Sequence, residues 1–295
     1  MSNKRYKIIA AICIVVCLFL ALYIYASSIT QQPAESAAYD AALVVTVIDV
    51  GQGDSILVTH GDDTMLIDAA SKASADAVLK KLREQRIEDI DFLVATHPHE
   101  DHIGGIVSVI ENYKVGAVYM ADTRSDSKTY KKLMSVIEAE DIPVIEAYAG
   151  IEFSLGAALC TIVSPARDAE HDANNESIVI FLDYLDSEFL FTGDMERKAE
   201  KELIKSGFDF DADVLKVAHH GSSTGTSEAF LKIASPEYAV ISCGEGNSYR
   251  HPHEETLFLL GEYEADILRT DISGGITFIS DGKTIIIKLE KAAAN

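Results

Sequence analysis

The sequence predicts an α/β domain in which helices cover β-sheets. Short apolar runs alternate along the chain with longer segments of helical periodicity, which is the pattern of sheets and covering helices. The chain has 295 residues, and 48% of them are hydrophobic. Because a domain usually has about 100 to 200 residues, this length and composition allow one large domain with a full core.

The start of the chain differs from the rest. Three of the first seven residues are basic, and an uninterrupted apolar stretch follows over residues 8 to 26. Such a stretch can cross about 30 Å of hydrocarbon as a helix. Because basic residues stay on the cytoplasmic side, we expect residues 1 to 7 in the cytoplasm, a transmembrane anchor over 8 to 26 and the remainder outside the cell. A cleaved signal sequence of a secreted protein is the alternative.

Residues 27 to 42 are rich in Ser, Gln and Ala and are predicted to form a tether. After the tether, strands are predicted over residues 43 to 50, 54 to 59 and 63 to 68, and an amphipathic helix over 73 to 86. A strand over 91 to 96 is followed by a helix over 103 to 113, a strand over 115 to 120, a helix over 127 to 140 and short strands to 163.

The second half continues the pattern. Strands are expected over residues 177 to 184, 188 to 192, 212 to 218, 237 to 243, 265 to 269, 275 to 280 and 284 to 289, and helices over 195 to 206, 226 to 233 and 253 to 262. The folded domain thus runs from 43 to 290, and 291 to 295 form a tail. Cys160 and Cys243 lie in strand-like runs and are interpreted as separate buried thiols. A disulfide between them, formed outside the cell, is the alternative.

The most informative motif follows the strand over 91 to 96. Residues 97 to 102 read His-Pro-His-Glu-Asp-His, which places three imidazoles within six residues. Imidazole nitrogen and carboxylate oxygen are ligands that zinc prefers and manganese accepts. The spacing directs His97 and His99 to one side, while Asp101 and His102 can serve a second ion. The sequence therefore predicts two divalent metal ions, Zn²⁺ or Mn²⁺.

This His-x-His-x-Asp-His motif, followed by Gly, resembles the signature of the metallo-β-lactamase fold hydrolases. Further segments resemble one branch, the extracellular hydrolase domain of ComEC-type DNA-uptake proteins. These segments are Asp49-Val50-Gly51-Gln52-Gly53-Asp54-Ser55, Ile67-Asp68, Thr192-Gly193-Asp194, Leu215-Lys216-Val217-Ala218-His219-His220-Gly221-Ser222 and Asn247-x-Tyr249-x-His251-Pro252. The resemblance covers about residues 43 to 289. It implies a four-layer αββα sandwich with the site at one edge, between the two sheets.

The resemblance also implies the second half of the site. Asp194 ends an apolar strand just before a helix, and the corresponding aspartate of the family bridges both metal ions. His219 and His220 follow another strand, where alternation sends them to opposite faces, so one of the two is expected to bind metal. The expected metal ligands are therefore His97, His99, Asp101, His102, Asp194 and one of His219 and His220.

The chain departs from the common superfamily pattern at Asn175, where many members have a further histidine. The ComEC branch resembles this chain in having Asn in place of that histidine. We expect the Asn175 amide to face the first ion and the substrate. Because amide oxygen is a weaker ligand than imidazole, that ion should be less zinc-selective, which makes manganese a candidate. His171 is the alternative ligand nearby.

Several polar residues are candidates for substrate binding and proton transfer. Ser222 and Ser223 can donate to a phosphate oxygen, although ordinary turn residues are the alternative interpretation. In the loop before the last long helix, His251 or His253 is expected to protonate the leaving oxygen, and Arg250 to bind phosphate.

The Gly-rich turn over residues 49 to 54 has a different expected task. It lacks the helix and the Lys of a phosphate-binding loop. Asp54 in this turn, and Asp68 after the next strand pair, are predicted to support the metal loop through hydrogen bonds, as carboxylates near metal ligands usually do.

A hydroxide shared by the two cations would attack phosphorus in line, with Asp101 among the catalytic groups. The resemblance implies an extracellular, membrane-anchored phosphodiesterase or nuclease, with single-stranded DNA among its candidate substrates. The net charge of −22 works against a general polyanion-binding surface, so any nucleic-acid contact should be local. The alternatives are a hydrolase of a small (phospho)ester or lactam, and a surface binding module with a decayed site.

Overall fold

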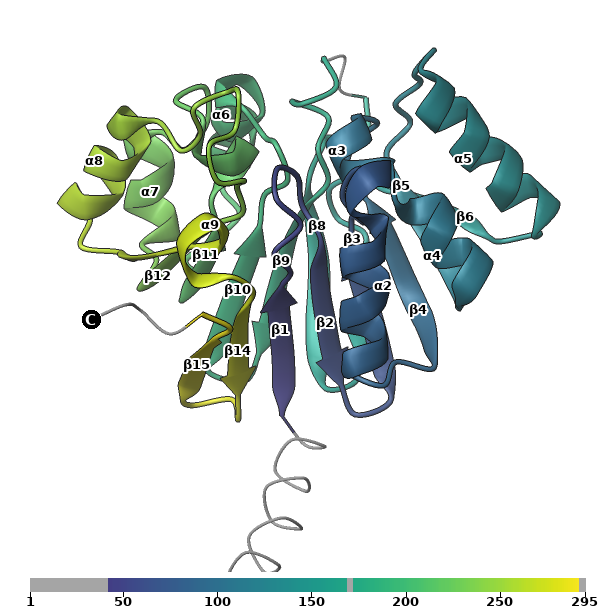
Figure 1. The fold of residues 1–295 in the computed structure, drawn as a ribbon. Helices are drawn as coiled ribbons and strands as arrows, with labels where there is room; N and C mark the ends of the chain where they lie inside the picture. Colours follow the sequence, from purple (N-terminus) through teal and green to yellow (C-terminus); the bar gives the residue numbers. More distant parts are fainter. Residues whose placement is uncertain (1–41, 169–171, 292–295) are drawn as a thin grey trace, which may run out of the picture. The chain divides into compact units, whose positions relative to one another are not determined.

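Two β-sheets packed face to face form the centre of the protein in the computed structural model, which describes residues 42 to 168 and 172 to 291 (Figure 1). The first sheet contains β1 (Leu43–Val47), β2 (Ile56–His60), β3 (Asp63–Ile67), β4 (Asp89–Ala95), β5 (Lys114–Met120), β6 (Val144–Glu146), β14 (Ile276–Ser280) and β15 (Ile285–Leu289). The second contains β7 (Glu152–Leu155), β8 (Ala158–Ser164), β9 (Val179–Tyr184), β10 (Ser187–Phe191), β11 (Val214–Lys216), β12 (Tyr238–Ile241) and β13 (Asp266–Arg269).

Helices cover the outer face of each sheet. The first sheet is covered by α2 (Ala75–Glu84), α3 (Glu100–Ile103), α4 (Ile106–Asn112) and α5 (Lys128–Ala139). The second is covered by α6 (Arg197–Ser206), α7 (Glu228–Ala234) and α8 (Glu254–Glu262). The short α9 (Thr270–Ser273) follows β13, and two 3₁₀ turns, η1 (Lys72–Ser74) and η2 (Ala218–Gly221), complete the elements. This order of layers is the predicted helix, sheet, sheet, helix sandwich.

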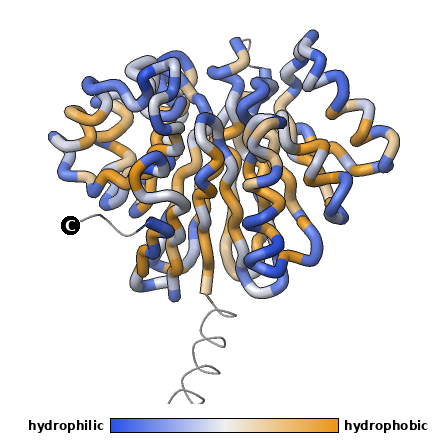
Figure 2. The backbone as a smooth tube through the Cα atoms, viewed as in Figure 1, coloured by the Kyte–Doolittle hydropathy of each residue, from blue (hydrophilic) through white to orange (hydrophobic). Residues whose placement is uncertain are grey.

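The strands read as apolar because both of their faces are buried. Side chains of β1 such as Val45 pack between the sheets against residues of the second sheet such as Phe189. Residues of the opposite strand faces, such as Leu66 of β3, pack under the helices, for example against Leu82 of α2. Figure 2 shows hydrophobic residues along the strands and hydrophilic residues on the outer surfaces of the helices. Burial on two faces explains why periodicity predicts these strands so well.

Parallel strands bring the functional loops to one edge. β3, β4, β5 and β6 run parallel in the first sheet, and β10, β11, β12 and β13 run parallel in the second. Their carboxyl ends therefore point to the same side within each sheet. The loops after β4, β10, β11 and β12 carry the residues that the sequence singles out.

The elements follow the predicted order with ends shifted by a few residues, apart from the short elements η1, η2 and α9, which were not predicted, and the division of one helix. The helix predicted over residues 103 to 113 is split into α3 and α4 at Gly104 and Gly105. A Cβ atom at Gly105 would lie 2.1 Å from the carbonyl oxygen of Ala69, and the Gly105 amide donates to the Ala70 carbonyl. The close approach of these two backbones breaks the helix there and requires glycine.

Two further expectations concern the ends of the chain and the cysteines. Within the described ranges, no helix has the length and apolarity needed to cross a bilayer. The expected anchor over residues 8 to 26 lies outside these ranges, as do the tether up to residue 41 and the tail from 292 onward. Cys160 and Cys243 are buried and unbonded, so the interpretation as separate thiols is confirmed.

Candidate metal centre

The metal loop begins where β4 ends, and Asp68 holds its two ends together. Oδ1 of Asp68 accepts from the Thr96 amide at 2.8 Å, and Oδ2 accepts from the Thr96 hydroxyl at 2.6 Å. The same Oδ2 lies 2.7 Å from Nδ1 of His102. All three residues are buried. Asp68 therefore orients His102, and its predicted supporting role is confirmed.

The Gly-rich turn lies against the other side of the metal loop. Gly53 has a φ of +128°, and a Cβ atom there would lie 2.3 Å from the Asp101 carbonyl oxygen, so only glycine allows this contact. The Asp54 amide donates to that same carbonyl at 3.2 Å. The Ser242 hydroxyl, just after β12, donates to the Gly53 carbonyl at 2.7 Å. This turn therefore connects the metal loop to the edge of the second sheet.

Asp194 lies between two groups of imidazoles. Its Oδ2 atom lies 3.7 Å from Nε2 of His97 and 3.6 Å from Nε2 of His219. Its Oδ1 atom lies 3.3 Å from Nε2 of His102 and 3.6 Å from Nε2 of His220. Each carboxylate oxygen thus faces a separate pair of rings, which is the placement that a bridging ligand needs.

Four sets of donors among the described residues are close enough to hold an ion, and two of them lie on either side of Asp194 without sharing a residue. In the part of the chain that the structure describes, His97, His99 and Asp194 bring one ligand atom each within 4.8 Å of one another. Asp101, His102 and His220 do the same. His220, and not His219, belongs to the second set. The other two sets share Asp54, which lies near Asp194 and His220 in one set and near Asp68 and His102 in the other.

The two adjacent histidines both face the cluster. The strand β11 ends at Lys216, so strand alternation does not set the directions of His219 and His220, contrary to the expectation from the sequence. Both residues have a left-handed backbone, with φ values of 48° and 55°. Nδ1 of His220 lies 3.0 Å from the Ser242 carbonyl oxygen, and Nδ1 of His219 lies 3.1 Å from Oε1 of Glu196. These partners turn the Nε2 atom of each ring toward Asp194.

The charges within the cluster are strongly coupled. Burial disfavours a charged ring at His102, but the carboxylates of Asp194 and Asp68 outweigh burial and raise the pKa of His102 well above its usual value. For His220, Asp194 and Asp54 likewise overcome burial and raise the pKa to about 9. Burial, together with the neighbouring His102, lowers the pKa of His97 well below the usual value. Without an ion, protons on His102 and His220 balance the carboxylates.

The donor set fits divalent ions. Among the described residues, Oδ1 of Asp54 and three further buried atoms of the cluster have no hydrogen-bond partner. The three further atoms are Nε2 of His102, Nε2 of His220 and Oδ1 of Asp194. Buried polar atoms are normally satisfied, and these three converge on one point. Four of the rings are also held by an oxygen at their second nitrogen, with Thr96 Oγ1 at 3.1 Å serving His97. Such outer oxygen partners are typical of metal-binding histidines.

Asn175 does not direct its amide as the sequence suggested. Its Oδ1 accepts from the Ala199 amide at 3.0 Å, near the start of α6. Its Nδ2 donates to both carboxylate oxygens of Asp172, at 3.1 and 2.9 Å. The expectation that this amide faces the first ion is therefore corrected, because one end of the side chain holds the start of α6 and the other end holds Asp172. His171 lies outside the described residues.

The candidate substrate residues lie at different depths. The His251 ring lies 5.4 Å from the His219 ring and 6.1 Å from the His220 ring. Burial, together with these two rings, lowers the pKa of His251 to about 4, so its ring is uncharged at neutral pH. His253 lies one ring further out, 4.9 Å from His251. Arg250 is exposed beside them.

The two serines are engaged in the turn after η2. The Ser222 hydroxyl is buried and lies 2.9 Å from the Thr224 hydroxyl. Nδ1 of His253 accepts from the Ser223 amide at 3.0 Å, and the Ser223 hydroxyl lies 3.1 Å away from the same atom. The structure thus shows Ser222 within the turn and Ser223 at its surface, where the alternative interpretation as turn residues also placed them.

Two residues of the site were not found from the sequence. Glu196 accepts from His219 and from the Thr224 hydroxyl, at 3.1 and 2.8 Å. Lys216 is buried and pairs with Asp54. A lysine inside an apolar strand was the available signal, because lysine is rarely buried without a partner. The only sequence signal that could have indicated Glu196 was its position two residues after Asp194.

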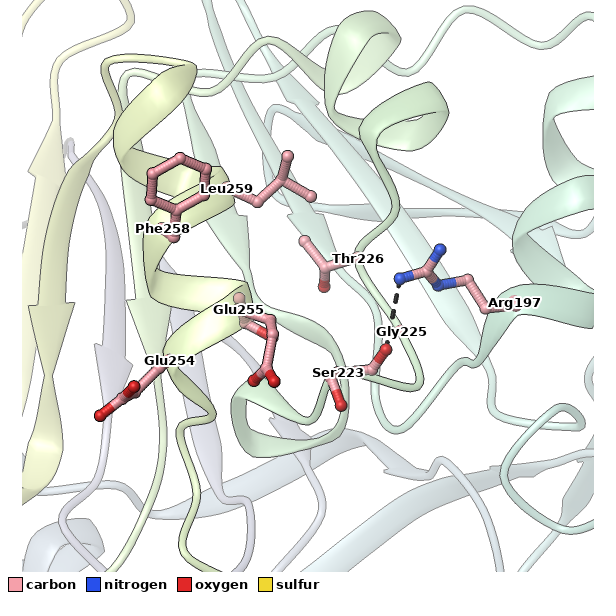
Figure 3. Close-up of a pocket in the computed structure, with 9 residues that line it drawn as sticks. Arg197, Ser223, Gly225, Thr226, Glu254, Glu255, Phe258 and Leu259 are labelled. Atoms are coloured by element: carbon pink, nitrogen blue, oxygen red, sulfur yellow. Dashed lines mark hydrogen bonds between the residues drawn. The ribbon is translucent and has the colours of Figure 1, made fainter.

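A pocket of about 420 Å³ is lined by residues of α6, of the turn after η2 and of α8 (Figure 3). Its lining residues are Arg197, Ser223, Gly225, Thr226, Glu254, Glu255, Thr256, Phe258 and Leu259. Figure 3 shows the Arg197 guanidinium donating to the Ser223 carbonyl, at 3.2 Å. None of the clustered histidines lines this pocket, and its two glutamates make it a poor place for a phosphate.

Comparisons with known proteins agree with this geometry. Residues 48 to 245 match the sequence model of the metallo-beta-lactamase superfamily. The chain is 29% identical over 252 residues to ComE operon protein 3 of Bacillus subtilis, an alignment covering 79% of this chain and 32% of that protein. It is 32% identical over 238 residues to competence protein ComA of Neisseria gonorrhoeae, again covering 79% and 32%. The chain therefore spans about a third of the length of these relatives.

Solved structures share the fold. The metallo-beta-lactamase fold protein YhfI of Bacillus subtilis superposes with a TM-score of 0.56 at 15% identity, over 81% of this chain and 100% of that chain. CmlA, a diiron beta-hydroxylase of Streptomyces venezuelae, superposes with a TM-score of 0.54 at 12% identity, over 78% of this chain and 53% of that chain. At these identities the likeness shows the fold alone.

Proposed function

The chain belongs to the metallo-beta-lactamase superfamily of metal-dependent hydrolases, and from this premise we propose that it is a phosphodiesterase that cleaves nucleic acid with two divalent ions, Zn²⁺ or Mn²⁺. The observation that carries the proposal is the position of Asp194. Its two oxygens face different sets of donors, and this arrangement suits a pair of ions better than a single one.

Each ion would have its own ligands. His97, His99 and Asp194 would hold the first ion. His219 would be a further ligand of this ion, because its Nε2 atom faces an oxygen of Asp194. Asp101, His102 and His220 would hold the second, with the other oxygen of Asp194. His219 supplies the third imidazole that Asn175 does not, which makes zinc as suitable as manganese for the first position.

Divalent ions at these positions supply Lewis acidity for a phosphoryl group and activate water for attack near neutral pH. The residues of the chain do the positioning. Asp68 and Glu196 fix the ring orientations of His102 and His219 through the nitrogens that face away from Asp194. We assign to His251 a hydrogen bond to the leaving oxygen, because its buried Nδ1 atom has no partner among the described residues. The exposed Arg250 is suited to bind a flanking phosphate.

A nucleic-acid substrate is supported by the relatives of the chain and limited by its charge. One of these relatives is named a competence protein. The net charge of −22 disfavours long tracts of phosphate contacts. We therefore propose that the substrate is a single strand of nucleic acid, held by local contacts at the metal centre. Duplex DNA should be the poorer substrate.

We also propose that the hydrolase domain acts outside the cell, held at the membrane by residues 8 to 26, with secretion as the alternative. The support is the basic start of the chain followed by the apolar stretch. Protease added to intact cells should degrade the domain. Protection until the cells are lysed would contradict the proposed orientation.

The test of the proposed activity uses the full chain in detergent, stripped of metal and then reloaded with Zn²⁺ or Mn²⁺. The substrates are single-stranded DNA, duplex DNA, bis(p-nitrophenyl) phosphate, a phosphocholine ester and a β-lactam. Hydrolysis of the phosphodiesters should depend on added metal and should nearly vanish in Asp101→Ala, which lacks a donor of the second set.

The matched control is Asp126→Ala, because Asp126 is fully exposed and pairs only with the exposed Lys131 on α5. Its activity should equal that of the wild type. Hydrolysis of the lactam or the phosphocholine ester alone would replace the proposed function with that of a small-ester or lactam hydrolase. Absence of hydrolysis with every substrate at full metal loading would indicate a binding module.

A further inference from the structure

Exposed aromatic rings are rare among the described residues, and one of them lies near the metal centre. Of the phenylalanine and tyrosine rings in residues 42 to 168 and 172 to 291, only Tyr249 and Phe258 are exposed, at 62% and 69%. Because an apolar ring in water is unfavourable, such exposure is typical of a surface that binds something. The two rings lie in one segment, formed by the loop before α8 and by α8 itself.

Tyr249 continues a row of rings that begins at the metal ligands. The Tyr249 ring is nearly parallel to the His251 ring, at 22°, with centroids 5.6 Å apart. His251 in turn lies 5.4 Å from His219 and 6.1 Å from His220. One ring thus separates Tyr249 from the metal centre. Since His251 covers one face of Tyr249 and most of the side chain is exposed, the outer face is open for stacking.

The loop that carries Tyr249 is held in place by Asn247. Its Oδ1 accepts from the His251 amide at 2.9 Å, and its Nδ2 donates to the carbonyl oxygens of His251 and Gly244 at 2.6 and 2.9 Å. Arg250 has a φ of +62°, an unfavourable conformation for a residue with a side chain. The surrounding bonds maintain this strain, and strain of this kind is typical of functional loops.

Charge indicates what the outer face of Tyr249 binds. The pocket beside Phe258 is lined by two acidic residues, Glu254 and Glu255, and by Arg197, whose guanidinium donates to the Ser223 carbonyl, whereas Arg250 follows Tyr249 directly. A chain with a net charge of −22 needs a source of nucleic-acid affinity other than basic residues. Stacking of a base on an aromatic ring is such a source, and it is tolerant of sequence.

We propose that Tyr249 is the base-stacking residue for a single-stranded nucleic acid whose phosphate lies at the metal centre. The proposal rests on the proposed function and adds to it the residue that holds a base of the substrate. A paired base is already stacked within its duplex and is not free to lie on Tyr249. The ring therefore selects single strands and also selects nucleic acid over small esters that lack a base.

The experiment measures binding, so that it does not depend on cleavage. The full chain, loaded with metal, is titrated with a fluorescent oligothymidylate whose phosphorothioate linkages resist hydrolysis, and with an abasic chain of the same length and linkage. Tyr249→Ala should weaken oligothymidylate binding by about 10- to 100-fold relative to its effect on the abasic chain. Tyr249→Phe keeps the ring and should bind like the wild type.

Phe258→Ala is the matched control, because it removes an equally exposed ring beside the acidic pocket. It should leave both affinities unchanged. Equal losses of affinity for the two ligands in Tyr249→Ala would mean that the ring only supports the loop. A larger loss of affinity in Phe258→Ala would mean that the nucleic acid binds at the pocket. Either result overturns the proposal, as would absence of oligothymidylate binding. Base-dependent binding without cleavage of natural DNA would retain the stacking role and reject the proposed activity instead.

Discussion

The Nζ atom of Lys216 lies 2.8 Å from Oδ2 of Asp54, and both side chains are buried beneath the metal centre. Burial alone would raise the pKa of the Asp54 carboxyl, but Lys216 and His220 outweigh it and hold the pKa well below its usual range. Oδ1 of Asp54 lies 3.3 Å from Nδ1 of His220. Lys216 therefore keeps Asp54 ionised, and Asp54 in turn orients a ligand of the second ion.

Replacing Lys216 by Met should destabilise the protein and weaken the second metal site. Loss of one partner of a buried pair costs about 3 to 5 kcal/mol, because the other charge remains buried without compensation. Urea unfolding of the metal-free protein measures this cost, and metal analysis measures the loss at the second site. Lys131→Met, which breaks an exposed pair with Asp126, should change the free energy of unfolding by less than about 1 kcal/mol. A similarly small change in the free energy of unfolding of Lys216→Met would show that the buried Asp54 does not depend on Lys216.

The two adjacent histidines should serve different ions. His220→Ala should remove the ion held with Asp101 and His102, whereas His219→Ala should weaken the other, since its Nε2 faces the opposite oxygen of Asp194. Plasma mass spectrometry of the dialysed variants should find about one ion per chain, against the two expected for the wild type.

Glu196→Gln provides a finer test of the His219 side. Loss of the carboxylate that accepts from His219 Nδ1 should weaken the first ion by about 10- to 100-fold, the usual effect of removing such a partner, and leave the second unchanged. Competition with a coloured chelator measures both affinities. Equal weakening of the two ions would mean that His219 does not distinguish them.

Replacing Asn175 by Ala should act on stability and leave the ions in place. The change leaves the buried Ala199 amide without its acceptor near the start of α6, at a cost of about 1 to 3 kcal/mol. Thermal and urea unfolding measure this loss, and metal analysis should still find the wild-type content. An altered order of zinc and manganese activation in this variant would restore the view that the Asn175 amide faces an ion.

Metal affinity should rise with pH. Ions bind unprotonated nitrogens, and the pKa of His220 is raised to about 9 by carboxylates that overcome burial, so ion binding at neutral pH displaces a proton. Affinity should weaken about tenfold per pH unit for each displaced proton and level off above about pH 9. Titrations in weakly buffered solution with a pH dye should record the released protons, and a pH-independent affinity would contradict this linkage.

Without metal, the raised pKa of His220 makes the fold less stable as the pH rises. A histidine whose folded pKa lies above its unfolded value stabilises the fold at low pH, and this contribution is lost as pH rises through about 9. Urea unfolding of the metal-free protein between pH 6.5 and 9.5 should therefore show a falling free energy, while the metal-loaded protein should not, because the ion replaces the proton.

The resemblance to the metallo-β-lactamase fold implied the layers, whereas the residue pattern itself determined the order of elements and the loop that carries His97, His99, Asp101 and His102. These features are local, because apolar periodicity and ligand spacing are set by residues close together in the chain. The division between α3 and α4 could not be predicted from such local patterns. It depends on the approach of Gly105 to Ala69, two residues that are distant in sequence.

Only the tertiary structure decided which partners the site residues have. His219 and His220 are neighbours in sequence, yet Glu196 orients one and Ser242 the other, because their left-handed backbone abandons the alternation of a strand. Asn175 likewise looked like a ligand until the start of α6 was placed beside it. Hydrogen bonds and ion pairs such as Lys216 with Asp54 act over a few ångströms and join loops from different strands. Their pairing is fixed when the two sheets pack, and no periodicity along the chain encodes it.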